Sequence, residues 1–298
     1  MSTGGLTPRV LEGRDRYERR MEGWTDNLHP DALTHTVTLA DDDHAVELTA
    51  VALPSPTYEI REARCRVLSG PVASGVARGV ESLAAARMVA GFTRRVAEAT
   101  GGGEGAGLVI DAAIEIARLA RQTTRLPREQ AERAAGGDAR ACWQLDTTGW
   151  VDLPDSCFTY SAAGRELLRA RTVTTPMTPD LYSPRPGQRR VFVRVKRARL
   201  ERVDGRLRLY HAMHDNVHGF EITYEIDLVT GRIISAEHVT PRLPYMGICS
   251  EPQTRIRSLL GETADDGLRK RIGTLIGGST GCAQLYDLTA DLLKLLAA

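Results

Sequence analysis

Strand-like runs of apolar residues occur in both halves of the chain. In the first half they cover residues 34–40, 45–53 and 57–66, and the middle run alternates apolar and polar positions as a half-buried strand does. The second half contains VFVRVKRARLERVDGRLRLYHAM and FEITYEIDLVTGRIISAEHV. Turn residues Asp204-Gly205 and Thr230-Gly231 interrupt these two stretches, and alternation on both sides of each turn predicts two β-hairpins.

Helical patterns follow the strands in each half. Apolar residues at three- and four-residue spacing predict helices over 76–99 and 106–122, and over about 252–262, 265–276 and 280–296. The segment GGGEG predicts a break between the first two, because several glycines together lose too much entropy to stay helical. Strands followed by helices, twice, predict an α+β fold with helices laid on an antiparallel sheet.

The second half also repeats part of the first. Residues 91–111 (GFTRRVAEATGGGEGAGLVID) align with residues 267–287 (GLRKRIGTLIGGSTGCAQLYD) at an offset of 176. The identical positions are Gly91, Arg95, Gly101, Gly102, Gly105 and Asp111, which match Gly267, Arg271, Gly277, Gly278, Gly281 and Asp287. Upstream, Asp41-x-x-His44 aligns with Asp215-x-x-His218 at an offset of 174. The comparison predicts two tandem copies of one fold that form a pseudo-twofold pair.

These patterns divide the chain into four parts. We expect an extended N-terminal arm over 1–30, a degenerate first repeat over 31–122, a connector over 123–155 and a second repeat over 156–298. A Pro-rich stretch, 174–188, interrupts the second repeat and fits either a lid or a linker.

Composition excludes several function classes. The net charge of +1 gives no electrostatic case for binding nucleic acid or an anionic membrane, and aromatic residues make up only 5% of the chain. No apolar run approaches the roughly 20 residues that a membrane helix needs. Five scattered cysteines favour a reducing cytoplasm over a disulfide framework. We therefore expect a cytoplasmic protein with a small-molecule ligand, and a homodimer stays open.

Two cysteines of the second half have no counterpart in the first. Cys282 opens the last predicted helix and Cys249 follows the last predicted strand. A cysteine at a helix N-terminus is favoured as a thiolate, and together with His218 the two thiols would suit zinc, iron or a sulfur-transfer site. The alternative is that each cysteine is a small buried hydrophobe. We assign that structural role to Cys65, Cys142 and Cys157.

The densest polar cluster is His211-x-x-His214-Asp215-x-x-His218. As a zinc motif its spacing is weak, because a strand places His211 and His214 on opposite faces. The alternative zinc-free interpretation pairs Asp215 with His218, whose tautomer the carboxylate would fix for general-base catalysis. The predicted catalytic residues are thus His218, Asp215 and Cys282.

Substrate contacts are assigned to four further residues: Tyr245, His214, His44 and Arg271. For Arg271 and its counterpart Arg95 the preferred alternative is an internal ion pair with Asp287 and Asp111, respectively. The glycine loops beside them match no dinucleotide or P-loop fingerprint, so nucleotide binding is not expected.

At GGSTGCAQLYDLTADLL the chain resembles a bacterial family of unknown function whose pattern ends in Gly-Gly-x-x-Gly-Cys-Thr-His-Leu-x-x-Leu. HGFEITYEIDL and PYMGIC carry the rest of the resemblance, which covers residues 190–298 well and residues 40–120 weakly. Where the family has Thr-His, this chain has Ala283-Gln284, so any role of that histidine is lost here. The order of elements is also similar to NifU-type iron–sulfur scaffolds and SufE-like sulfur acceptors, which implies ligand positions at Cys249 and Cys282.

Taken together, the residues favour an enzyme that acts on a small molecule, with His/Asp acid–base or Cys thiolate chemistry and no organic cofactor. Cyclisation, isomerisation, elimination and hydrolysis are not distinguished, and specialised metabolism is the expected setting. Two alternatives stay open: a metal or iron–sulfur carrier built on His218, Cys249 and Cys282, and a ligand-binding protein without catalysis.

Overall fold

The computed structural model describes residues 8–135 and 138–297. The strands are β1 (Arg16–Asp26), β2 (Leu33–Asp41), β3 (Ala45–Ala52), β4 (Ile60–Ser69), β5 (Phe192–Val203), β6 (Arg206–Asp215), β7 (Gly219–Asp227) and β8 (Ile233–Arg242). The α-helices are α1 (Ser74–Glu81), α2 (Phe92–Thr100), α3 (Ala106–Ala120), α4 (Arg128–Ala134), α5 (Ala139–Gly149), α6 (Ala162–Ala170), α7 (Pro179–Tyr182), α8 (Leu268–Ile276) and α9 (Ala283–Ala297). Short 3-10 helices are η1 (Arg9–Leu11), η2 (Phe158–Tyr160), η3 (Glu251–Leu259) and η4 (Gly278–Thr280).

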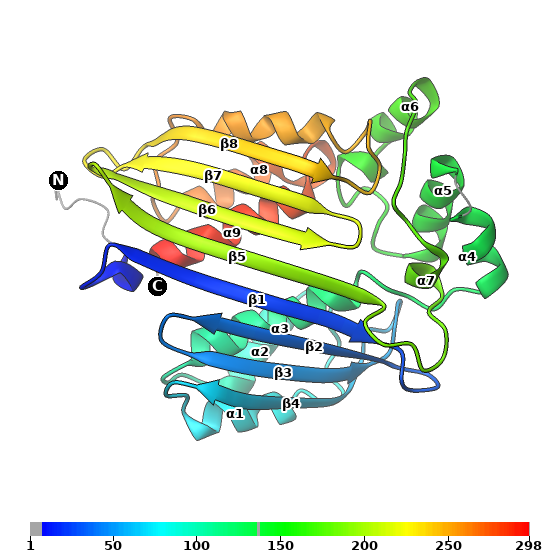
Figure 1. Ribbon diagram of the computed structural model, residues 1–298, viewed down its shortest axis with the longest axis horizontal. Coiled ribbons are helices and arrows are strands. Elements are labelled where there is room, and N and C mark those ends of the chain that lie inside the picture. The colour runs from blue at the N-terminus through cyan, green and yellow to red at the C-terminus, as the bar shows by residue number, and fades with distance from the viewer. Residues whose placement is uncertain (1–7, 136–137, 298) are drawn as a thin grey trace.

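All eight strands form one antiparallel sheet in the order β4-β3-β2-β1-β5-β6-β7-β8. From the central β1–β5 pair the strands step outward in chain order on both sides (Figure 1). The predicted α+β class with an antiparallel sheet is confirmed. Both hairpins are confirmed as well, and Asp204 and Gly205 take the positive φ angles that a two-residue hairpin turn requires.

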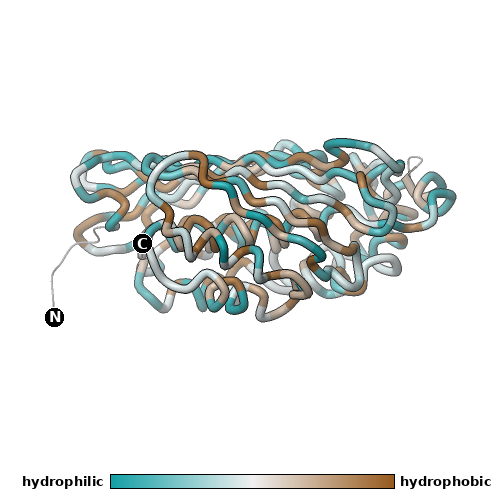
Figure 2. The backbone as a smooth tube through the Cα atoms, turned by 90° about the horizontal axis from the view of Figure 1, so that it is seen from below, coloured by the Kyte–Doolittle hydropathy of each residue, from teal (hydrophilic) through white to brown (hydrophobic). Residues whose placement is uncertain are grey.

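The helices of the two halves cover one face of this sheet, as the edge-on view shows (Figure 2). Under β1–β4 the core contains residues such as Leu48 and Ile116, and under β5–β8 it contains residues such as Ile222 and Leu288. No helix in the described ranges covers the opposite face (Figure 1). None of those helices combines the length and the apolar composition that a membrane crossing requires.

The expected N-terminal arm over 1–30 is wrong for residues 16–26, which form the central strand β1. The charged residues of this strand are tolerated in the sheet because ion pairs, such as those between neighbouring strands, neutralise them. Glu18 is buried, and Arg197 of β5 donates a hydrogen bond of 2.8 Å to its carboxylate. Tyr17 and Met21 face the core.

The helix predicted over 76–99 is two helices, α1 and α2. Between them the chain turns back to the start of β4, where Ala85 N–H donates to the carbonyl of Ile60 (2.8 Å) and Ile60 N–H donates to the carbonyl of Ala86 (2.9 Å). Ala85 takes a positive φ of 65° there. The long-range backbone hydrogen bonds outweigh the local helical pattern.

Helices α3 and α9 lie side by side under the centre of the sheet and exchange ion pairs. Arg118 of α3 lies 3.1 Å from Asp287 of α9, and Lys294 of α9 lies 2.9 Å from Asp111 of α3. The predicted partners of Asp111 and Asp287 are therefore wrong. Arg271 instead bonds Glu262 and Asp265 on the surface of its own half.

Candidate functional site

A cavity of about 140 Å³ lies at the end of the sheet where the β6–β7 hairpin turns. Its walls come from that hairpin, from the segment after β8, from the start of α9 and from the connector between the halves. Figure 1 shows the connector helices α4 and α5, and the helices α6 and α7 that follow them, beyond this end of the strands. The residues that line the cavity include Asp146, Trp150, Cys157, Thr159, Tyr160, His218, Tyr245, Cys249, Gln253, Gly281 and Cys282.

His218 stands at the end of the β6–β7 turn and is held by Asp215. Its Nδ1 lies 3.1 Å from both carboxylate oxygens of Asp215, and the same carboxylate accepts the backbone N–H of Val217 (2.8 Å) and of His218 (2.6 Å). Because an ionised carboxylate only accepts, Nδ1 carries the proton. In the neutral ring Nε2 is then a proton acceptor, and it has no hydrogen-bond partner within residues 8–135 and 138–297.

A buried arginine supports this pair from the neighbouring strand. Arg194 of β5 is opposite Asp215 in the register, and its Nε and Nη2 donate to Oδ2 at 2.9 and 2.7 Å. Burial alone would raise the pKa of Asp215, but its interactions with His218 and with the Arg194 guanidinium hold it well below its usual range. Asp215 therefore stays ionised and the orientation of His218 is fixed.

A second buried carboxylate, Asp146 of α5, lines the cavity itself, whereas Asp215 does not line it and reaches it only through His218. It accepts hydrogen bonds from three tyrosine hydroxyls: Tyr160 (2.7 Å), Tyr182 (2.8 Å) and Tyr245. Burial raises the pKa of Asp146 to about 6, and the three hydroxyls oppose that rise. Asp146 is thus mostly ionised at neutral pH, and no Lys, Arg or His in the described ranges forms an ion pair with it.

Three thiols also line the cavity. The Cys249 Sγ lies 2.9 Å from the Thr159 hydroxyl. Burial raises the pKa of Cys249, and the nearby Cys157 and Cys282 add to that rise. Cys282 precedes α9, where Gly281 permits a close backbone approach to Ile276 whose carbonyl accepts the Cys282 N–H. Burial raises the pKa of Cys282 in spite of its bonds to backbone N–H groups of α9. Burial thus opposes the thiolate expected at this helix start, which stays a prediction.

Two buried polar atoms of the cavity wall lack a hydrogen-bond partner in the described part of the chain. These are Nε1 of Trp150, a donor, and Oε1 of Gln253. Both residues are almost fully buried, with 3% and 1% of their surface exposed. A buried polar atom without a hydrogen-bond partner costs folding free energy, and a ligand that bonds to each of these two atoms would remove that cost.

The predicted metal ligands His218, Cys249 and Cys282 share the cavity but do not form a ligand set. In the described ranges the one group of three metal-binding side chains within 4.8 Å of one another is Asp41, Asp43 and His44. Four-coordinate zinc needs ligand atoms that lie within such a distance of one another, so His218, Cys249 and Cys282 do not fit this ion.

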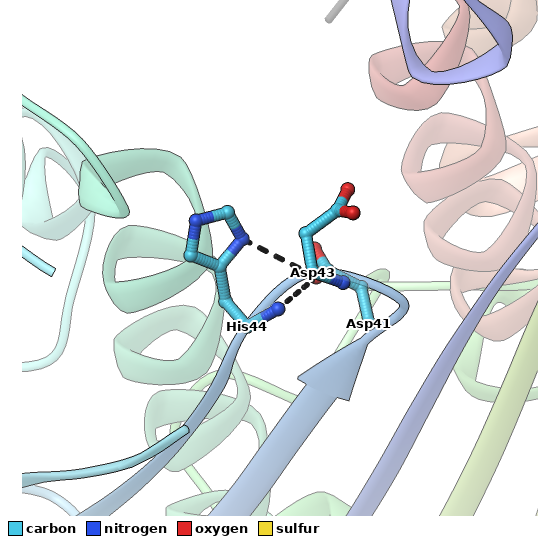
Figure 3. A group of neighbouring side chains, drawn as sticks. All are labelled: Asp41, Asp43 and His44. Atoms are coloured by element: carbon cyan, nitrogen blue, oxygen red, sulfur yellow. Dashed lines mark hydrogen bonds and ion pairs between the residues drawn. The ribbon is translucent and has the colours of Figure 1, made fainter. Parts of the chain in front are cut away.

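The Asp41 group is an ordinary turn. Asp41 Oδ1 accepts the N–H of Asp43 (3.0 Å) and of His44 (2.8 Å), while Asp43 forms an ion pair with Arg14 at 2.6 Å. Figure 3 shows His44 directed toward Asp41, with the Asp43 carboxylate turned away from both. The local hydrogen bonds account for the cluster.

The other predicted contacts lie away from the cavity. His214 is half exposed on the uncovered face, 3.5 Å from Glu221, and His211 is buried on the other face against the Leu288 carbonyl. His44 and Arg271 are not cavity residues either. Tyr245 is one, and it donates to Asp146.

Asp146, Tyr160, Gln253 and Cys157 were not assigned to the site from the sequence. A signal for Asp146 exists: the buried stripe of α5 is Ala139, Cys142, Trp143 and Asp146, so a carboxylate occupies a core position of an amphipathic helix. The structural role expected of Cys157 overlooks its place on the cavity wall.

Comparison with known proteins adds one family. A model of the family described as a protein of unknown function (DUF2889) matches residues 179–297. This supports the expected resemblance of the second half to a family of unknown function. No curated protein and no solved structure matches the chain. The matched segment contains His218, Tyr245, Cys249 and Cys282, whereas Asp146 lies outside it.

Proposed function

We propose that this cavity is the active site of an enzyme that acts on a small molecule, with His218 as the general base and acid. The observation that carries the proposal is the Arg194–Asp215–His218 chain, in which the imidazole is oriented through Nδ1 by a carboxylate that is itself held ionised. That arrangement leaves Nε2 of a cavity residue to take up and return a proton.

A ligand in this cavity is supported by the unpaired polar atoms of its wall. Trp150 Nε1 can donate and Gln253 Oε1 can accept, and both lie among apolar side chains. A few polar groups that converge in a mostly apolar cavity are typical of small-molecule sites. Burial raises the pKa values of Cys249 and Cys282, which favours proton transfer at His218 over thiolate attack.

We further propose that the halves are tandem copies of one unit related by a pseudo-twofold axis. Element order, strand order and the reciprocal pairs Arg118–Asp287 and Lys294–Asp111 support this, because each pair maps onto the other at the offset of 176. The first copy would be structural and the second would carry the chemistry. The NifU- and SufE-type similarity stays a prediction and supports no step of the mechanism.

The test is turnover by the purified full chain. Mixed libraries of small metabolites are incubated with the protein, consumed compounds are identified by mass spectrometry, and the best one is used for kinetics. We expect His218→Gln to lower kcat by about 10²- to 10⁴-fold, the usual contribution of a general base. His44→Gln is the matched control, since it removes a histidine from the same turn motif outside the cavity, and it should leave kcat unchanged.

Two results would overturn the proposal. Wild-type kcat in His218→Gln would remove the base from the mechanism. Near-stoichiometric zinc or iron in anaerobically purified protein, lost in Cys249→Ala, would favour the carrier alternative.

A further inference from the structure

Asp146 is a buried charge that no cation of the described chain neutralises. Only 2% of the residue is exposed, and no Lys, Arg or His in the described ranges forms an ion pair with it. Arg121, the one arginine of the cavity wall, lies 2.8 Å from Asp152 instead. Asp215, the other buried carboxylate here, has both Arg194 and His218. A buried carboxylate normally has a charged partner, so the missing one needs an explanation.

The hydrogen bonds of Asp146 leave room for one more donor. An ionised carboxylate has about four acceptor sites. Tyr160 and Tyr245 donate to Oδ2 and Tyr182 donates to Oδ1. Oδ1 accepts one bond, from Tyr182, so it keeps an acceptor site, and Asp146 lines the cavity in which a molecule would bind.

Aromatic rings surround this position. Tyr160 and Tyr245 meet edge to face at 6.2 Å, and Trp150 and Tyr182 do so at 5.4 Å. Trp150, Tyr160 and Tyr245 are cavity residues. Aromatic faces attract cations, and the attraction grows when the cation is desolvated.

We propose that Asp146 binds the protonated primary amine of a small, otherwise apolar ligand. The ammonium group would supply the missing positive charge and the fourth hydrogen bond, and the cavity volume of about 140 Å³ suits an apolar part about the size of a benzene ring. This inference names the substrate class of the proposed enzyme site and rests on that proposal only for the claim that the ligand is transformed.

Benzylamine is a suitable probe, with benzyl alcohol as its neutral counterpart of similar size. Isothermal titration with the full chain at about pH 7.5 should give at least about tenfold tighter binding of the amine, the effect of one added charge pair. At about pH 5 the amine affinity should fall about tenfold, because a carboxyl that titrates at about 6 is then mostly protonated while benzylamine stays cationic.

Two variants test whether the preference for the amine over the alcohol depends on Asp146. Asp146→Asn should remove the preference for the amine, whereas Glu166→Gln, a charge removed from the exposed surface of α6, should keep it. The comparison of amine with alcohol at about pH 7.5 uses wild-type protein, so it decides the matter even where Asp146→Asn does not fold. Equal affinity for amine and alcohol, or no binding of the amine, would each overturn the proposal.

Failure of this inference and failure of the proposed function give different results. His218→Gln should bind benzylamine as wild type does, whatever its effect on turnover. Loss of turnover in His218→Gln without any amine preference would keep the general base and reject the ammonium site.

Discussion

The Asp41–His44 turn and the Asp215–His218 turn have the same backbone design and different surroundings. In both, the aspartate carboxylate accepts the N–H groups of the second and third residues after it, and the aspartate N–H donates to the histidine carbonyl at 2.8 Å. An arginine of the preceding strand is opposite the aspartate in each register, Arg19 in one and Arg194 in the other. The turn by itself is therefore a structural device.

What differs is where each arginine binds. Arg194 gives two hydrogen bonds to Asp215, whereas Arg19 bonds Asp111 at 2.7 Å and stays 3.6 Å from Asp41. Beyond the second turn the connector closes a cavity over His218. The chemistry proposed for His218 therefore depends on Arg194 of the neighbouring strand and on the cavity wall, neither of which is part of the Asp-x-x-His motif.

Substitution of the arginine should give the largest difference in unfolding free energy between the two turns. Arg194→Met leaves the fully buried Asp215 carboxylate with His218 alone, and the loss of one partner of a buried ion pair costs about 3–5 kcal/mol of unfolding free energy. Arg19→Met should cost about 1–2 kcal/mol, because Asp111 keeps Lys294 and Asp41 keeps the Tyr17 hydroxyl. Urea unfolding followed by circular dichroism measures both, and equal losses would contradict the distinction.

The Asp146 carboxylate should contribute a pH dependence of its own to the stability of the protein. The folded pKa of Asp146, about 6, exceeds its reference value of 3.8, so the folded state holds a proton that the unfolded state has released between these values. Stability from this group is therefore present at low pH and is lost as the pH rises through about 6, by about 3 kcal/mol in total. Unfolding free energies of wild type relative to Asp146→Asn should fall by that amount between about pH 4 and pH 8. The same comparison with Glu166→Gln should stay flat, and a flat curve for Asp146→Asn would reject a buried, uncompensated carboxylate.

Local signals predicted the parts of the fold that local chemistry decides. Asp204-Gly205 and Thr230-Gly231 mark hairpin turns because Asp204, Gly205 and Gly231 take positive φ angles that few residues accept. The strand β1 was missed because its charged residues are balanced in part by β5, whose residues come more than 160 positions later, as the contact of Glu18 with Arg197 shows. The break between α1 and α2 was missed for the same reason, since it depends on backbone bonds to Ile60.

Of the candidate site, too, the sequence predicted only a part. His218, Tyr245, Cys249 and Cys282 were singled out because they differ from the first half or flank its shared motifs, and the structure places all four on one cavity wall. Asp146 has no counterpart to compare. Its three tyrosine partners come from three separate segments, so its role depends on contacts that periodicity does not encode.

The smallest effect tests whether the halves are equivalent copies. Asp287 with Arg118 (3.1 Å) and Asp111 with Lys294 (2.9 Å) would be the same interaction seen twice across a pseudo-twofold axis. Double-mutant cycles that combine Asp287→Asn with Arg118→Met, and Asp111→Asn with Lys294→Met, isolate each coupling energy. Because these side chains are partly exposed, each coupling should be about 0.5–1 kcal/mol, and the two should agree within a few tenths. A strong coupling in one cycle and none in the other would show that the offset of 176 aligns residues without aligning their roles. In that case the first half should be treated as a scaffold in its own right.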